Sequence, residues 1–133
     1  MQIKYKIKTK PSFLKPFGIL YNSAQAIFNT IWIPKYLLDR INQGDINSLS
    51  IIEHEKTHIL RAQKYGMFKW YLMYCFSNSF RLKEEIEAIR IEFKYLKKNN
   101  IIPDYEKKAK WLSSLIYLNM ISYDEALNVL KAM

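Results

Sequence analysis

The first residues of the chain alternate between apolar and charged side chains. Ile3, Tyr5 and Ile7 are separated by lysines. A period of two puts the apolar side chains on one face of an extended segment, which predicts a half-buried strand with a charged outer face. Residues 17–22 and 26–33 are rich in β-branched and aromatic side chains and are predicted to be further strands. The N-terminal third is therefore predicted to form a small sheet.

Beyond residue 34 the apolar positions take the spacing of helices. Asp104 is placed to cap one helix, and Ser122 starts the pattern of a capping box for the last one. Near residue 48, the N-cap is either Ser48 or a capping box of Ser50 with Glu53. The predicted helices cover residues 35–43, 48–65, 67–77, 80–98, 105–119 and 123–132, with glycines at 44 and 66 as stops. A sheet followed by helices predicts an α+β fold.

Length and composition fit one globular domain over residues 1–133, with half of the residues apolar. The net charge of +9 arises from 17 Lys and 4 Arg against 12 acids. Because Lys lacks the planar donor fork of Arg, we attribute this charge mainly to a solvated surface and expect no nucleic-acid partner. We also expect no transmembrane segment and no signal peptide, since no apolar run is long enough for either. With Cys75 as the only cysteine, a reducing compartment is predicted.

The only two histidines of the chain, His54 and His58, lie four residues apart, and Glu55 follows the first in an HExxH motif. Side chains at i and i+4 project from one face of a helix, so both imidazoles can bind one metal ion. Zn²⁺ takes neutral His nitrogens at about 2.0–2.1 Å, and a Glu beside the first His can accept a proton from water on the metal. The alternative interpretation is a pair of surface or core histidines beside a surface Glu.

A catalytic zinc site usually has three protein ligands, and the third has to come from elsewhere in the chain. The acid-rich segment 81–88 is the candidate source, with Glu84 and Glu85 competing for the role. A helix over residues 67–77 would bring this segment back antiparallel to the HExxH helix. The alternative is a solvated helix face on which the acids pair with Arg81 and Lys83.

The HExxH motif followed by E-x-E-A at residues 85–88 resembles the HExxH…ExxA arrangement of gluzincin metallopeptidases. The chain is most similar to the small, minimal metallopeptidases of bacteria and their phages. In those proteins a Gln, a helix-ending Gly and an aromatic helix lie between the two motifs, and Gln63, Gly66 and residues 68–76 occupy these places here. The resemblance covers about residues 26–95 and implies a zincin-like fold.

This resemblance implies a zinc-dependent peptidase that acts on a peptide or protein substrate. His54, His58 and Glu85 would bind Zn²⁺, with Glu85 chosen because an Ala follows it three residues later. Zinc lowers the pKa of its water, and Glu55 accepts the proton as that water attacks the peptide carbonyl, then passes it to the leaving amine. An edge strand would hold the substrate by main-chain hydrogen bonds, a role expected of residues 26–33. The implied location is the cytoplasm of a bacterial or phage-infected cell, or the virion.

The chain also departs from this family. Ile89 stands where related gluzincins often carry an Asp that orients a metal-binding His, so Glu84, Glu87 or a backbone carbonyl is expected to take that role. An oxyanion donor is not assigned; the candidates are Tyr65, Tyr71 and Tyr74.

Two other functional classes fit the sequence. One is a non-catalytic structural or binding protein on a zincin-like fold, such as a phage component, in which chelation of the metal lowers stability and no turnover occurs. The other is a basic nucleic-acid-binding domain with an accidental HExxH, which binds no metal and loses affinity steeply with salt.

Overall fold

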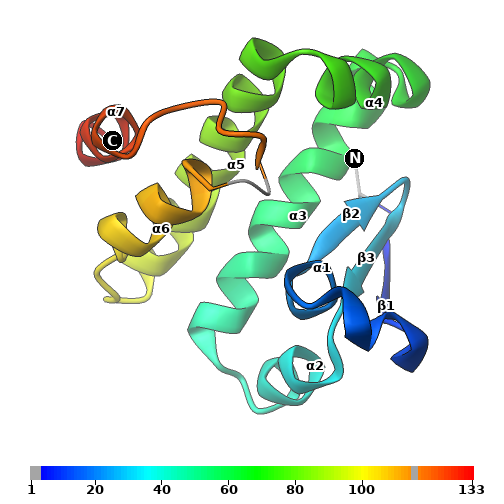
Figure 1. Ribbon diagram of the computed structural model, residues 1–133. Helices are drawn as coiled ribbons and strands as arrows, with labels where there is room; N and C mark the ends of the chain where they lie inside the picture. The colour runs from blue at the N-terminus through cyan, green and yellow to red at the C-terminus, as the bar shows by residue number, and fades with distance from the viewer. Residues whose placement is uncertain (1–3, 115–116) are drawn as a thin grey trace.

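Figure 1 shows a computed structural model of the chain, which describes residues 4–114 and 117–133. A small sheet contains β1 (Lys6–Thr9), β2 (Gln25–Ile27) and β3 (Thr30–Ile33). β3 is the middle strand, parallel to β1 and antiparallel to β2. Ile31 and Ile33 project from one face of β3 and are fully buried, in a cluster that includes Ile52 and Ile59 of the long helix beside the sheet.

The prediction of a strand near the N-terminus is confirmed for residues 6–9, whereas Ile3 lies outside the described residues. The strand predicted at 17–22 is wrong. This part of the chain forms a 3₁₀ helix, η1 (Ser12–Phe17), and a single turn, α1 (Ile19–Asn22). Gly18 joins them with a φ of 50°, and the amides of Tyr21 and Asn22 donate to its carbonyl. A left-handed Gly followed by local hydrogen bonds is incompatible with a continuous strand.

The single strand predicted at 26–33 is a hairpin of β2 and β3. The chain reverses at Phe28, which has a φ of 52°, and Asn29. The amide of Phe28 donates to the hydroxyl of Tyr71, 2.7 Å away on a distant helix. This tertiary contact stabilises a turn that the β-branched composition does not indicate.

The helices follow the predicted order. They are α2 (Lys35–Asn42), α3 (Ile46–Tyr65), α4 (Met67–Phe76), α5 (Asn78–Lys98), α6 (Tyr105–Leu112) and α7 (Tyr123–Lys131). The cap by Asp104 and the capping box of Ser122 with Glu125 are confirmed. Gly66 separates α3 from α4 with a φ of 90°.

The helix boundaries differ from the prediction by at most two residues, except at the end of α6. α3 begins at residue 46 because Asp45 is its N-cap and accepts a hydrogen bond from the amide of Ser48, so neither Ser48 nor Ser50 caps it. The helix predicted at 105–119 ends at Leu112. Leu118 and Asn119 have φ values of 57° and 49°, which a right-handed helix does not contain.

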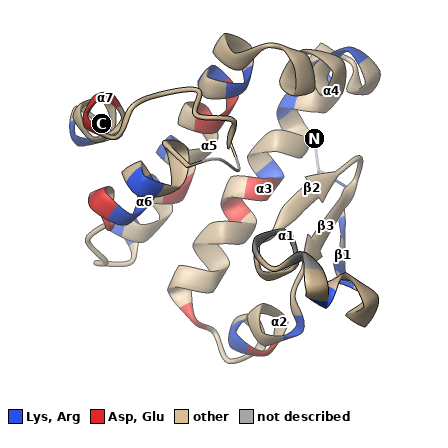
Figure 2. Cartoon of the chain, in the orientation of Figure 1, with Lys and Arg blue, Asp and Glu red and all other residues tan. Residues whose placement is uncertain are grey.

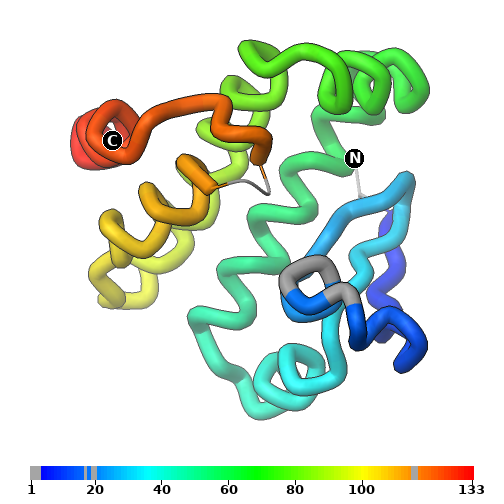
Figure 3. Tube along the Cα trace, viewed as in Figure 1, coloured from blue at the N-terminus to red at the C-terminus, as the bar shows by residue number. Residues whose placement is uncertain are grey.

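Helices α3 and α5 lie side by side and antiparallel, because α4 reverses the chain between them (Figures 1 and 3). The sheet packs against one side of α3. On the far side of α5, helices α6 and α7 close a second apolar cluster of Ile89, Phe93, Leu96, Ala109, Leu112, Ala126 and Leu130. The fold is α+β, and the interface between α3 and α5 lies between the two clusters. Among the described residues, no helix is both long and apolar enough to cross a bilayer.

Candidate metal centre

The interface between α3 and α5 brings together the three predicted ligands. α3 presents His54 and His58 one turn apart, and α5 presents Glu85 opposite them, all three buried. The two Nε2 atoms are 3.2 Å apart. Glu85 Oε2 is 3.3 Å from Nε2 of His54, and Glu85 Oε1 is 3.2 Å from Nε2 of His58. The group can therefore bind a metal ion.

The separation of the two imidazole nitrogens is close to that of two ligands on a tetrahedral ion, and each nitrogen lies at a similar distance from a different oxygen of Glu85. Ligands at about 2.0–2.1 Å from zinc occupy tetrahedral corners about 3.3–3.4 Å apart. Within the described residues, Glu85 Oε2 is buried and makes no hydrogen bond. Buried polar atoms are nearly always hydrogen-bonded, and this oxygen lies 3.3 Å from Nε2 of His54 without such a bond, an arrangement that a cation between the two atoms would satisfy. The donor set and its spacing both fit a divalent metal.

His54 is held from both sides by carboxylates. Its Nε2 faces Glu85, and its Nδ1 lies 2.9 Å from Oε2 of Glu92. Burial disfavours the charged imidazolium, but the hydrogen bonds and charges of the two carboxylates outweigh it and raise the pKa of His54 to about 10. A metal ion has to displace this proton, since a ligating imidazole is neutral.

Glu92 is the orienting acid that the sequence interpretation missed. Lys108 of α6 donates to its carboxylate at 2.7 Å. Burial opposes the ionised form of Glu92, but the charge of Lys108 and the bond to His54 lower its pKa to about 2. Glu85 and Glu92 are seven residues apart, or about two helical turns, and therefore lie on one face of α5. Because α5 runs antiparallel to α3, the part of α5 beside His54 comes later in the chain than the part beside His58. The antiparallel register of the two helices is therefore the signal that identifies Glu92.

The other two acids of the segment have different partners, so the prediction that one of them orients a histidine is wrong. Glu84 is fully buried and accepts hydrogen bonds from Arg61 Nη2 at 2.7 Å and from Trp70 Nε1 at 3.0 Å. It therefore ties α3, α4 and α5 together and does not compete for the metal. Glu87 forms a 2.5 Å ion pair with Arg90 at the surface.

The ligand atoms open onto a pocket of about 650 Å³, which Glu55 also lines. Of the three tyrosine candidates, Tyr65 is exposed and absent from this wall, whereas Tyr71 and Tyr74 belong to it. The Tyr74 hydroxyl donates to Oε1 of Glu85. Burial and the charge of Glu85 raise the pKa of Tyr74 above its ordinary value, so this hydroxyl keeps its proton at neutral pH.

Tyr117 is a further pocket residue that nothing in the sequence pattern indicated. Its hydroxyl accepts a hydrogen bond of 3.0 Å from Trp111 Nε1. Burial, together with the charges of Glu85 and Glu55, raises its pKa well above the ordinary value. Two protonated phenols, from α4 and from the segment after α6, thus face the candidate ligand Glu85.

The hairpin contributes only part of the segment expected to hold a substrate. β3 is paired on both sides, so residues 30–33 have no free edge, and that part of the prediction is wrong. β2 is at the edge of the sheet, and residues 24–27 line the pocket. Tyr71 anchors this strand to α4, since its hydroxyl donates to the carbonyl of Ala26 at 3.2 Å.

Comparison of the chain with models of protein families, with curated proteins and with solved structures finds no match.

Proposed function

We propose that this protein is a zinc-dependent peptidase with a zincin-like fold, in which His54, His58 and Glu85 bind the metal. The observation that carries the proposal is the buried cluster of His54, His58 and Glu85, in which the two Nε2 atoms are 3.2 Å apart and each lies 3.2–3.3 Å from one oxygen of Glu85, at the wall of a pocket that Glu55 shares. A purely structural site would not need an acid beside the ligands or a pocket in front of them.

Each pocket residue then has a role that its position supports. A bound zinc ion supplies Lewis-acid chemistry and lowers the pKa of a water molecule. Glu55 accepts the proton of the attacking water and returns it to the leaving amine. The free edge of β2 binds an extended peptide by main-chain hydrogen bonds. Glu92 fixes the ring of His54 through Nδ1, which leaves Nε2 directed at His58 and Glu85.

The first experiment is elemental analysis of the purified, tag-free protein beside His58→Ala, Glu85→Gln and Glu84→Gln. Glu84→Gln is the matched control, because it changes an adjacent buried acid that does not face the histidines. We expect about one zinc per chain in the wild type and in Glu84→Gln, and loss of zinc in the other two. Absence of bound metal from the wild type, even after zinc is supplied, would contradict the proposal.

The second experiment separates catalysis from metal binding. Glu55→Gln is expected to retain zinc while cleavage of fluorescently labelled, unfolded casein falls by about 10²–10⁴-fold, the usual contribution of a general base. Zinc in both proteins, cleavage by neither and loss of folding on chelation would instead identify a structural site.

A further inference from the structure

The outer face of α4 exposes apolar side chains that the proposed function does not use. Phe68 is 77% exposed and Phe76 is 85% exposed, with Leu72 between them also exposed. Their spacing of four residues aligns them in one stripe along the helix. Trp70 projects from the opposite side and is buried, so α4 is apolar on both its inner and its outer face. The inner face is accounted for by the fold and the outer face is not.

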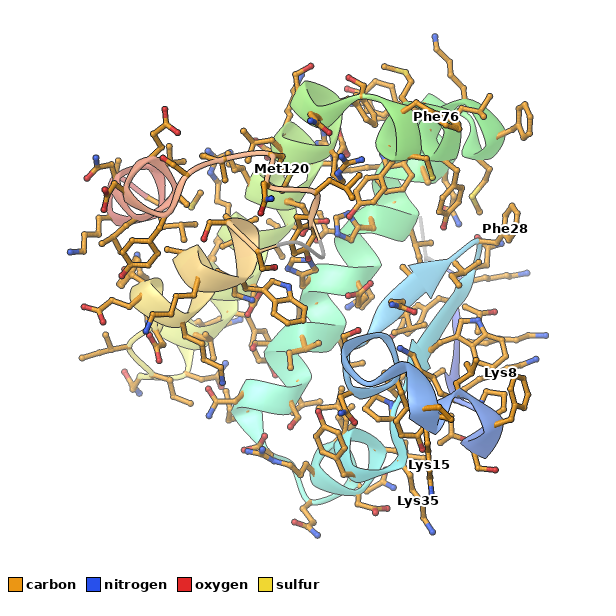
Figure 4. The ribbon with its side chains drawn as sticks, in the orientation of Figure 1. Lys8, Lys15, Phe28, Lys35, Phe76 and Met120 are labelled. Carbon is orange, nitrogen blue, oxygen red and sulfur yellow. The ribbon has the colours of Figure 1, made fainter. Side chains whose placement is uncertain are left out.

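The tip of the β2–β3 hairpin lies against α4 and is also apolar. Ile27 and Phe28 are exposed there. The ring of Phe28 lies 5.4 Å from that of Tyr71, which joins the hairpin tip to α4. Figure 4 shows Phe28 and Phe76 at the same end of the molecule. We call Phe68, Leu72, Phe76, Ile27 and Phe28 the apolar end. Contiguous exposed apolar surface of this kind marks an interaction site in soluble proteins.

The charged side chains of α4 and of the chain on either side of it are all basic. Residues 56–83 contain six Lys and Arg residues and no acid. Lys64, Lys69 and Lys83 are exposed, and no ion pair joins any of them to an acid within the described part of the chain. In Figure 2, α4 carries basic colour and no acidic colour. The apolar end thus has basic side chains and no acid on the same stretch of chain. It is therefore complementary to a partner surface that combines an apolar layer with anionic groups.

We propose that the apolar end docks on an anionic lipid surface, with the two exposed Phe side chains of α4 in the boundary between headgroups and acyl chains. Amphipathic elements bind membranes in this way, by apolar burial together with attraction of basic side chains to anionic headgroups. Lysine favours a lipid over a protein partner, because Lys is depleted at protein–protein interfaces and Arg is enriched there. The inference does not depend on the proposed peptidase activity.

Flotation of the protein with vesicles tests this proposal, using phosphatidylcholine alone and phosphatidylcholine mixed with phosphatidylglycerol. The wild type is expected to float with the mixed vesicles and to release them at high salt. Phe68→Ser with Phe76→Ser should weaken binding at least about tenfold, since the apolar contact is lost. Lys64→Gln with Lys69→Gln should weaken it about thirtyfold, at about 1 kcal/mol for each cation.

Ile102→Ser is the matched control. Ile102 is 88% exposed and lies in the loop between α5 and α6, away from the apolar end, so its removal should leave flotation unchanged. All substituted side chains are exposed, and circular dichroism is expected to show an unchanged fold in every variant. No flotation of the wild type with either vesicle, or equal flotation of all variants, would overturn the proposal.

The single cysteine supplies an independent readout. Cys75 is exposed on α4, so an environment-sensitive fluorophore attached to it reports the polarity around this helix. We expect its emission to shift to the blue with mixed vesicles. Flotation without such a shift would mean that another surface binds the lipid. A different outcome is that the wild type does not float but dimerises with rising concentration, and that the Phe68→Ser, Phe76→Ser protein does not dimerise. That result would contradict the lipid proposal and identify a second copy of the chain as the partner of the apolar end.

Discussion

Helix α5 borders two interiors of opposite character. Toward α3 and α4 it buries three carboxylates, those of Glu84, Glu85 and Glu92. Toward α6 and α7 it buries Ile89 and Phe93 within an apolar cluster. The two interiors share one helix and lie within a few turns of each other, so the difference between them comes from the side chains and not from the architecture.

The apolar interior stabilises the fold by itself, whereas the interior that holds the carboxylates needs compensating partners. Burial of apolar surface is favourable, whereas burial of an ionised carboxylate costs several kcal/mol unless partners compensate it. Glu84 and Glu92 have full compensation from Arg61, Trp70, His54 and Lys108. Glu85 retains one oxygen, Oε2, that accepts no hydrogen bond from the part of the chain that the structure describes. This incomplete hydrogen bonding beside a pocket fits the proposed metal site, in which a bound cation would satisfy the free oxygen.

Zinc should therefore stabilise the folded protein, through the interior that holds the carboxylates, more than any single side chain does. At a free concentration about a thousand times its Kd, zinc is expected to raise the free energy of unfolding by about 4 kcal/mol, because it binds the folded chain. Urea unfolding with zinc and with a chelator measures this difference. The control is Glu85→Gln, which should show no such increment. An equal increment in that variant would place zinc binding at another site.

A cavity in the apolar interior should destabilise the fold without affecting the metal site. Leu112 is almost fully buried in the α5–α6–α7 cluster, so Leu112→Ala is expected to lower the free energy of unfolding by about 3 kcal/mol. The zinc content of the folded variant should remain that of the wild type. Ile102→Ala, at an exposed position, should change stability by less than about 0.5 kcal/mol. A loss of zinc in Leu112→Ala would show that the two interiors are coupled.

The sequence predicted the elements whose signals are local. Asp104 and Ser122 start their helices because caps depend on the neighbouring residues alone. Residues 17–22 were misassigned because β-branched and aromatic composition reports burial and not extended backbone, and the left-handed Gly18 decides the conformation. The turn at Phe28 depends on Tyr71, more than forty residues away, so no local pattern could show it.

The residues of the candidate site divide in the same way between those with local sequence signals and those without. His54 and His58 follow from their i, i+4 spacing alone, whereas Glu85 needed a resemblance between motifs to distinguish it from Glu84. In the structure, Glu85 faces the histidines and Glu84 faces Arg61. Glu92 was missed because its role depends on the antiparallel register of two helices, which neither helix encodes by itself.

The link from Glu92 to His54 should strengthen the binding of zinc. Glu92→Gln is expected to weaken zinc binding about 10–100-fold, because the ring of His54 loses the charged acceptor that orients it. Competition with a chromophoric chelator measures this Kd. Glu87→Gln changes an acid on the surface of the same helix and should leave the Kd unchanged. Equal affinities in Glu92→Gln and the wild type would show that Glu92 serves Lys108 alone.

The smallest expected effect is that of removing one helix cap, either beside the metal site or in the apolar interior. Asp45 caps α3, which carries the histidines, and Ser122 caps α7 of the apolar interior. Each change to Ala should lower the free energy of unfolding by about 1 kcal/mol at pH 7, since caps act locally. Hydrogen bonding from Ser48 lowers the pKa of Asp45, so its contribution is complete above the ordinary Asp pKa of about 3.9 and is lost as the pH falls through the folded-state value. The deficit of Asp45→Ala in urea unfolding should therefore shrink in acid, and a deficit that grows in acid would mean that Asp45 acts by something other than its carboxylate.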